Sequence, residues 1–195
     1  MVSPNVYTPV LVALGANLPH DGRTPAQTLQ AAIAALPDEG LVVVQASRLY
    51  ATACFPAGAG PNYVNAAIRL RAEPGAAARD ILAALHRIEA RFGRARSERW
   101  GIRTLDLDLL AMGSRIAPDP ATAALWRDLA PPDQIAATPD RLILPHPRLQ
   151  DRAFVLVPLA DVAPRWRHPA LGLTVAQLLR RLPMADRRAV VAQDG

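Results

Sequence analysis

The segment Thr104–Leu110, with the sequence TLDLDLL, most constrains the fold because it alternates apolar and acidic side chains. Side chains of a β-strand point alternately to opposite faces. A strand here buries its alternating leucines in a core and sets Asp106 and Asp108 together on the other face, about 7 Å apart. Two carboxylates at that separation repel each other unless a cation lies between them. The segment therefore predicts a strand between a hydrophobic core and a cation-binding surface.

The residues before this segment show the order strand, helix, strand, strand, helix. Val10–Asn17 is typical of a buried strand that ends in a turn, and Leu41–Tyr50 and Tyr63–Arg71 predict two further strands. The loop between the latter two, ATACFPAGAGPN, is rich in Pro and Gly and too long for a tight hairpin. Loops of this length often carry function.

Two helices fill the gaps between these strands. The first shows an N-terminal capping pattern, with Thr24 as the N-cap, Pro25 at the first helical position and Gln27 completing a capping box. The second is predicted to begin at Pro74, and its apolar residues form one stripe. The members of that stripe are Ile81, Leu82, Leu85, Ile88 and Phe92.

This order of elements, β-α-β-β-α-β, predicts an α+β ferredoxin-like sandwich, in which two helices cover one face of an antiparallel sheet. We expect the other face to be free for a site. Residues 114–140, rich in Pro, Ala and Asp, predict a long insertion or flap after the fourth strand, with a short helix around TAALWRDLA. Further C-terminal helices include one capped by Thr174. We expect residues 1–195 to form a single domain.

The charged residues exclude two kinds of phosphate site. All 22 basic residues are arginine, against 17 acidic residues, and the net charge is +5. Without lysine the chain cannot form a Walker A site or a protein-kinase site.

The single cysteine, Cys54, cannot form an intramolecular disulfide and fits a cytoplasmic protein. No apolar run approaches the ~20 residues of a membrane span, so we expect no membrane partner.

Arginines gather immediately before the aspartate pair. Oxygen ligands suit Mg²⁺, which binds through one or two carboxylates and substrate phosphates. A nucleoside triphosphate and two aspartates carry about six negative charges, so two Mg²⁺ and about two arginines would balance them. The pattern therefore predicts Mg²⁺-dependent chemistry on a nucleotide. The six arginines are Arg87, Arg91, Arg94, Arg96, Arg99 and Arg103.

Two other functions share part of this pattern. The segment RARSERWGIR resembles a nucleic-acid patch with Trp100 as a stacking platform. That reading leaves Glu98, Asp106 and Asp108 unexplained, since clustered carboxylates repel a phosphate backbone, and we expect no nucleic-acid partner. Another Mg²⁺-dependent phosphoryl or nucleotidyl transferase would use the same metal site but would need no flat aromatic pocket.

Four motifs, in order, resemble the family of 2-amino-4-hydroxy-6-hydroxymethyldihydropteridine pyrophosphokinases. RWGIRTLDLDLL is similar to the family's RWGPRTLDLDIL, and ALGANL resembles its G-S-N-L turn. NYVNAAI is similar to its Y-L-N-A strand, and LPHPRLQDRAFVLVPLADVAP to its PH…RxFVLxPLxEIAP stretch. The resemblance spans Val10–Pro164.

The resemblance implies a reaction and a set of site residues. ATP would give its β,γ-pyrophosphoryl group to 6-hydroxymethyl-7,8-dihydropterin, releasing AMP. Two Mg²⁺ would be held by Asp106 and Asp108, which form the catalytic set together with Arg94 and Arg103. The implied ATP-binding residues are His86, Glu89, Arg96, Leu109, Arg141, His146 and Arg152. The implied pterin-binding residues are Thr52, Ala53, Phe55, Tyr63, Asn65, Trp100 and Phe154.

Within that pocket the resemblance places the pterin ring between Trp100 and Phe154, with Asn65 on its pyrimidine edge. A planar, polar heterocycle gains stacking energy on its faces and specificity at its edge. We expect ATP and the pterin to be the only partners of a monomeric protein.

Overall fold

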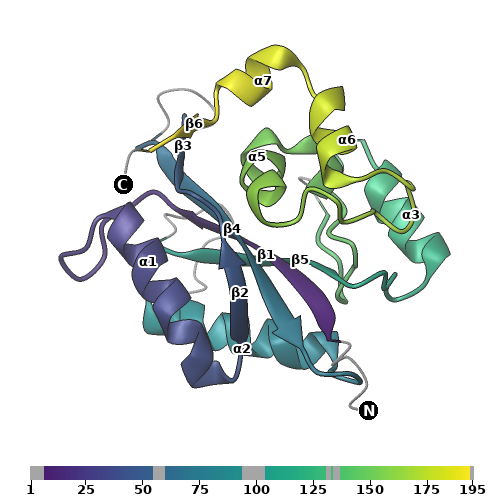
Figure 1. Cartoon of the computed structure of the whole chain (residues 1–195), viewed down its shortest axis with the longest axis horizontal. Coiled ribbons are helices and arrows are strands. Elements are labelled where there is room, and N and C mark those ends of the chain that lie inside the picture. Colours follow the sequence, from purple (N-terminus) through teal and green to yellow (C-terminus); the bar gives the residue numbers. More distant parts are fainter. Residues whose placement is uncertain (1–6, 55–59, 94–103, 131–132, 134–136, 194–195) are drawn as a thin grey trace, which may run out of the picture.

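The computed structural model describes residues 7–54, 60–93, 104–130, 133 and 137–193. In this part of the chain an antiparallel sheet of six strands lies at the centre, in the order β5–β1–β4–β3–β6, with β2 also paired to β4 (Figure 1). The strands are β1 (Thr8–Ala16), β2 (Val42–Ala46), β3 (Tyr50–Thr52), β4 (Tyr63–Ala72), β5 (Asp106–Met112) and β6 (Val191–Ala192).

The single strand predicted over Leu41–Tyr50 is wrong, because this segment forms two strands, β2 and β3. Both pair with β4, but residues 47–49 lie opposite only two residues of β4. Ser47 uses its hydroxyl to accept the Ala67 N–H, at 2.9 Å. The extra residue and this side-chain bond interrupt the regular pairing, as in a bulge.

Helices α1 (Pro25–Ala35) and α2 (Ala78–Arg91) cover one face of the sheet, together with the 3₁₀ turn η1 (Leu36–Glu39). The capping box predicted at the start of α1 is confirmed, with reciprocal bonds between Thr24 and Gln27. The predicted start of the second helix is wrong by four residues. Gly75 has a φ of 87°, a left-handed conformation that a helix cannot contain, so α2 begins after this turn.

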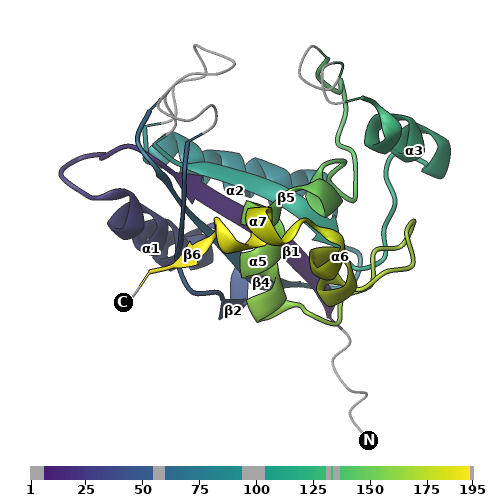
Figure 2. The same cartoon turned by 90° about the horizontal axis from the view of Figure 1, so that it is seen from above.

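The expectation that the second sheet face is free is also wrong. Helix α5 (Ala153–Val162) packs across β1 and β4 on this face, and α6 (Val175–Arg181) packs beside α5. Figure 2 shows α2 and α5 on opposite sides of β1 and β5. The inner side of α5 is apolar and its residues belong to a second core with Leu11, Ala13 and Ala67. The sheet is therefore covered on both faces, and a site must lie where α5 ends.

Strand β5 has the predicted alternation. Leu105, Leu107 and Leu109 are between 0% and 3% exposed and belong to the core under α1 and α2. Asp106 and Asp108 are half-buried and lie on the other face. A register shift opposite Leu11 and Val12 then ends the alternation, so that Leu110 and Ala111 both join the second core.

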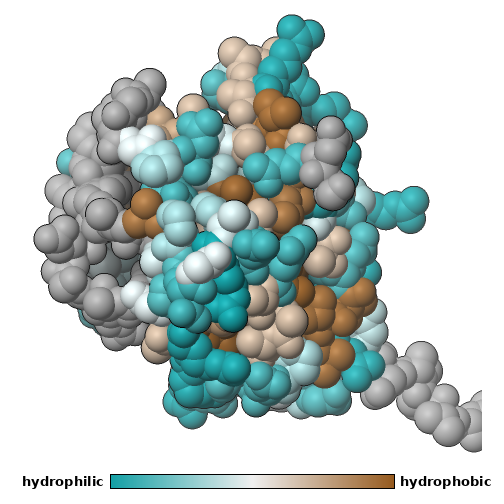
Figure 3. Space-filling view, turned by 90° about the vertical axis from the view of Figure 1, so that its left-hand side faces the viewer, coloured by the Kyte–Doolittle hydropathy of each residue, from teal (hydrophilic) through white to brown (hydrophobic). Residues whose placement is uncertain are grey.

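The C-terminal part is helical, as expected. The short helix expected within residues 114–140 is α3 (Pro120–Asp128), capped by Asp119, and Thr174 caps α6 through a second capping box. The remaining elements are η2 (Leu149–Asp151) and α7 (Met184–Arg188). No helix in the described residues has the length and apolar character needed to span a membrane. In the face that Figure 3 shows, apolar residues form separate small patches among hydrophilic ones.

Candidate active site at the start of β5

A polar row crosses the sheet where the apolar contacts of α5 end. The contacts of α5 with the sheet reach Ala13 and Ala67, which are paired with each other. The next row on the same face pairs Asp106 with Gly15 on β1 and Gly15 with Asn65 on β4. Two strand spacings separate the first and last of these residues, about 10 Å. The row therefore sets a residue expected to bind metal opposite one expected to bind the pterin.

Gly15 keeps this row open because it has no side chain. A Cβ atom at this position would lie 3.4 Å from Asn65 Oδ1, so the asparagine amide reaches over the glycine. Asn65 is 6% exposed, and its Nδ2 donates to Thr52 Oγ1 at 2.8 Å. Tyr63 pairs with Thr52 in the register of β3 and β4. The structure thus brings together three of the residues predicted to bind the pterin.

Glu89 on α2 anchors β5 between the two aspartates. Its Oε1 accepts the backbone N–H of Leu107 at 2.8 Å, and the side chain is 2% exposed. β5 is an edge strand of the sheet, so this carboxylate pairs an edge N–H that would otherwise need another partner. Because Leu107 lies between Asp106 and Asp108, the bond fixes the backbone that carries both. The adenine contact expected of Glu89 stays a prediction.

His146 contacts β5 three residues further along the strand. Its backbone N–H donates to Leu110 O at 2.8 Å, and its Nδ1 accepts the Arg148 N–H at 3.1 Å. Burial, together with the positive charge of Arg152, lowers the pKa of His146 to about 3, although the charge of Asp106 acts in the opposite direction. The ring is therefore neutral near pH 7. Since Nδ1 accepts a hydrogen bond, Nε2 carries the proton and can donate to a phosphate oxygen.

Arg152 and Phe154 begin helix α5. Arg152 is the N-cap residue, and its guanidinium carbon lies 5.6 Å from the centre of the Phe154 ring. Phe154 is 41% exposed, unlike most large apolar side chains of this helix. An exposed aromatic ring at the start of α5 is available to stack on a planar ligand.

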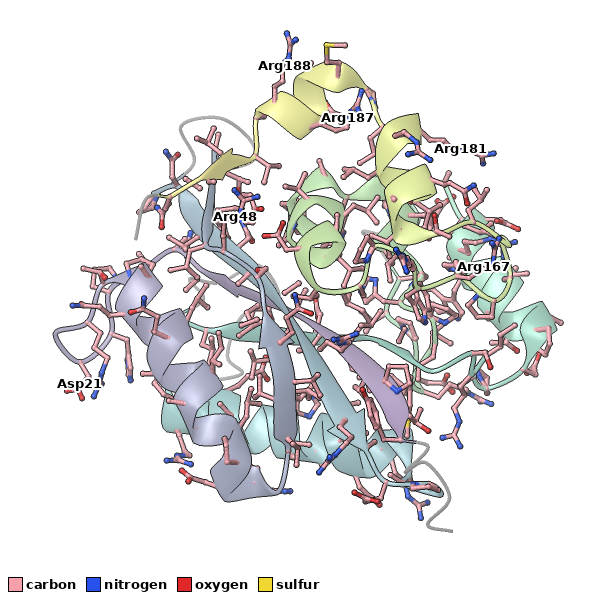
Figure 4. All side chains as sticks on the ribbon, viewed as in Figure 1. Asp21, Arg48, Arg167, Arg181, Arg187 and Arg188 are labelled. Carbon is pink, nitrogen blue, oxygen red and sulfur yellow. The ribbon has the colours of Figure 1, made fainter. Side chains whose placement is uncertain are left out.

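Sequence reasoning missed a network that ties the far end of α5 to β3. Tyr50, which pairs with Asn65, donates its hydroxyl to Asp161 Oδ2 at 2.7 Å. Arg48 donates from Nε to Asp161 Oδ2 and from a terminal nitrogen to Oδ1, each at 3.3 Å. Figure 4 shows Arg48 on the side of the sheet that faces α5. No sequence pattern indicates the contact, because Tyr50 and Asp161 are 111 positions apart.

The charges of this network shift two pKa values. Burial raises the pKa of Tyr50 to about 12, and the hydrogen bond to Asp161 adds to the shift. Burial acts to raise the pKa of Asp161, but the hydrogen bonds from Arg48 and Tyr50 outweigh it and lower that pKa. The tyrosine is therefore a neutral donor and the aspartate a charged acceptor throughout the neutral range. The network ties the C-terminal end of α5 to Tyr50 of β3 and to Arg48, which precedes this strand.

Other residues predicted for the site are less closely grouped. Arg141 is exposed and paired with Asp140 at 3.0 Å, and the charge of Asp119 at the start of α3 acts on it. Ala53 is exposed, and His86 is half-buried one helical turn before Glu89. The Leu109 side chain is buried under the helices, so only its backbone can reach a ligand. The predicted residues that lie outside the described part of the chain are Phe55, Arg94, Arg96, Arg99, Trp100 and Arg103.

The two aspartates fit Mg²⁺ in kind but do not complete its ligand set. Paired carboxylates are the ligands this ion prefers, and it usually keeps several waters and takes substrate phosphates as further ligands. In the described residues, no group of three or more His, Cys, Asp or Glu side chains could hold a metal ion. A pair of carboxylates is the kind of ligand set that Mg²⁺ completes with waters and substrate phosphates. A cavity of about 500 Å³ lies elsewhere, along residues 7–9, 75–76 and 112–116.

The sequence matches a known family over most of its length. Residues 11–164 match the model of the family described as 7,8-dihydro-6-hydroxymethylpterin-pyrophosphokinase (HPPK). The 2-amino-4-hydroxy-6-hydroxymethyldihydropteridine pyrophosphokinase of Pseudomonas aeruginosa is 38% identical over 177 residues, covering 89% of this chain and 91% of that protein. The protein of the same name from Synechocystis is 38% identical over 155 residues, covering 79% and 68%.

A solved structure has the same fold. The wild-type HPPK-DHPS of Plasmodium falciparum matches with a TM-score of 0.59 at 14% identity, over 91% of this chain and 45% of that chain. This chain thus spans less than half of that longer protein, and at this identity the match concerns the fold alone. The family model and the two relatives, in contrast, match the amino-acid sequence over most of this chain. The chain belongs to the HPPK family.

Proposed function

We propose that this chain transfers pyrophosphate from ATP to the hydroxymethyl group of 6-hydroxymethyl-7,8-dihydropterin, giving AMP and the pterin diphosphate, in folate biosynthesis. Family membership makes the chain an enzyme of the pyrophosphokinase type. The observation that carries the proposal is the row Asp106–Gly15–Asn65, which pairs a metal-binding type of side chain with an amide able to read a heterocycle. A bicyclic ring bound at its edge by Asn65 would direct its substituent toward Asp106.

Asp106 and Asp108 would hold two Mg²⁺. When bound, these ions would neutralise charge on the triphosphate and stabilise the charge that develops on the transferred group. The protein's own contribution is position: Glu89 holds the backbone N–H of Leu107, the residue between the two aspartates. Neutral His146 would donate its Nε2 proton to a phosphate oxygen, and Arg152 would add a positive charge nearby.

The remaining assignments rest on the resemblance. Arg94 and Arg103 would bind the phosphates, with Arg96 and Arg99 beside them, and Arg141 would contact ATP. His86, Glu89 and the Leu109 backbone would form the adenine pocket. Trp100 would stack on the pterin face opposite Phe154, and Thr52, Ala53, Phe55 and Tyr63 would line the pocket.

We also propose that the sheet and the helices α1 and α2 form a ferredoxin-like sandwich, with residues 114–140 as an insertion, in a single domain. The sheet order, with β2 and β3 sharing the edge of β4, supports this. A monomer in the cytoplasm, with small-molecule partners only and no nucleic acid or membrane, completes the proposal.

The test is the identity of the nucleotide product. The protein is incubated with MgATP and 6-hydroxymethyl-7,8-dihydropterin, and AMP, ADP and pterin products are separated by chromatography. We expect AMP and pterin diphosphate in equal amounts, and no AMP when the pterin is omitted. ADP as the product, or AMP formed without the pterin, would point to a different phosphoryl or nucleotidyl transferase. Replacement of Trp100 by alanine should weaken pterin binding, whereas such a transferase would keep its acceptor affinity.

A further inference from the structure

Asn17 has a buried amide oxygen without a partner. The residue is 8% exposed, and its Oδ1 accepts no hydrogen bond from any residue that the structure describes. A buried polar atom left unpaired costs about 1–3 kcal/mol of folding free energy. Native proteins keep few such atoms, and each needs an explanation, for example a ligand or a water molecule.

Asn17 lies next to the polar row. It directly follows Ala16, the last residue of β1, which pairs with Val64. Asn17 is also two residues after Gly15. In an extended chain, side chains two residues apart point to the same face of the sheet. Gly15 of the motif GAN keeps the polar row open, whereas Asn17 of the same motif has no role among the residues assigned above.

The hydrogen-bonding groups around Gly15 favour one kind of ligand. Asn65 turns its Nδ2 to Thr52 and its Oδ1 toward Gly15. Asn17 stands two residues beyond Gly15, directly after the end of β1, and its unpaired amide oxygen is a second acceptor at this end of the strand. Two acceptors suit a ligand edge that carries several N–H donors, as the amino-pyrimidine ring of a pterin does. The triphosphate of ATP offers acceptors only and would be repelled.

We propose that Asn17 is a specificity-determining residue for the pterin, whose Oδ1 accepts a hydrogen bond from an N–H of the heterocycle. The inference rests on the proposed function, since it names a further contact in the same site. The unpaired oxygen lowers the stability of the free protein, and the same oxygen strengthens pterin binding. The free protein bears the cost of an unpaired buried oxygen, and the bound pterin removes that cost.

The test replaces Asn17 by leucine, which has a similar shape and no polar atom. Thermal unfolding of the free protein is measured, together with the Kd for 6-hydroxymethyl-7,8-dihydropterin and for a nonhydrolysable ATP analogue with Mg²⁺. We expect Asn17→Leu to leave the free protein as stable as the wild type or more stable. We also expect its pterin Kd to rise about tenfold, with the Kd for the ATP analogue unchanged.

Thr28 offers a matched control. It is fully buried on α1, and its Oγ1 also lacks a partner in the described residues. Thr28→Val should likewise keep or raise stability, but it should leave the pterin Kd unchanged, because α1 lies on the opposite sheet face. Asn17→Ala excludes a steric explanation, since a smaller side chain that loses pterin affinity cannot block the pocket.

The possible results separate the inference from the function on which it rests. If the wild type binds the pterin, and Asn17→Leu and Asn17→Ala both bind it within twofold of the wild type, the inference is overturned. It is equally overturned if both variants unfold at lower temperature with unchanged pterin Kd, which is the result for an oxygen paired to an internal water. Absence of pterin binding by the wild type itself would instead contradict the proposed function.

Discussion

The carboxylate of Glu89 accepts the N–H of Leu107 at 2.8 Å, which joins the last turns of α2 to the strand that carries both aspartates. The bond reaches the backbone N–H of Leu107, the one residue between Asp106 and Asp108. A contact from a rigid helix to this position controls where the two carboxylates stand. Positioning of this kind is required for metal-dependent transfer, because small displacements of catalytic groups greatly reduce the rate.

Replacement of Glu89 should show whether the site depends on the hydrogen bond that the Glu89 side chain accepts or on its negative charge. Glu89→Gln keeps an oxygen that can accept the Leu107 N–H, whereas Glu89→Ala leaves this buried group unpaired and creates a cavity. We expect Glu89→Ala to lose about 2–4 kcal/mol of unfolding free energy in urea and to lower kcat, while Glu89→Gln loses much less of both. Equal losses in the two variants would show that the negative charge, not the hydrogen bond, is what the site needs.

Replacement of either aspartate by asparagine should abolish turnover without unfolding the protein. The side chains of Asp106 and Asp108 lie on the face opposite the buried leucines, so Asp106→Asn or Asp108→Asn disturbs no core contact. We expect a loss of about 3 kcal/mol or more in transition-state stabilisation, measured as kcat/KM at saturating Mg²⁺. The melting temperature should stay within a few degrees of the wild type. A variant that unfolds instead would mean that the carboxylate has a structural role.

The sequence predicted well those features that depend on neighbouring residues. The alternation in β5, the capping box at Thr24 and the N-cap at Thr174 are local patterns, and all three are confirmed. The start of α2 was wrong because Gly75 adopts a left-handed turn, which competes with the helical preference of the following residues. The split into β2 and β3 depends on one extra residue opposite β4, which only the pairing reveals.

Contacts between distant segments could not be predicted. Helix α5 covers the second sheet face because its apolar side completes a core with β1 and β4, and no local signal names that partner. The Glu89–Leu107 bond spans 18 positions and the Tyr50–Asp161 bond spans 111. Asn17 belongs to a predicted turn motif, but its unpaired oxygen appears only once the chain is folded.

Loss of Asp161 should loosen α5 from β3. Asp161→Ala removes the acceptor for Tyr50 and Arg48, and leaves the hydroxyl of the buried Tyr50 side chain without the carboxylate. We expect a loss of about 2 kcal/mol in unfolding free energy and weaker pterin binding, because Phe154 lies in the first turn of α5. Tyr50→Phe alone should cost about 1 kcal/mol. If the two residues act through their bond, the double variant loses less than the sum of the two, as a double-mutant cycle would measure.

Acid should destabilise the protein partly through His168. This side chain is 2% exposed, and its Nδ1 accepts the N–H groups of Ala170 and Leu171, each at 3.2 Å. Burial, with the charge of Arg127, lowers the pKa of His168 from 6.5 to about 4. Between these pH values the unfolded chain binds more protons than the folded one, so stability falls as the pH falls.

The variant His168→Asn should reduce this pH dependence. An asparagine oxygen can accept from the same two N–H groups but does not titrate. The wild type should lose up to about 3 kcal/mol more than the variant between pH 7.5 and pH 4, measured as unfolding free energy in urea at each pH. Above pH 7 the two curves should run parallel, because His168 is neutral in both the folded and unfolded wild type. Parallel curves over the whole range would contradict the assignment, because they would mean that His168 titrates alike in both states.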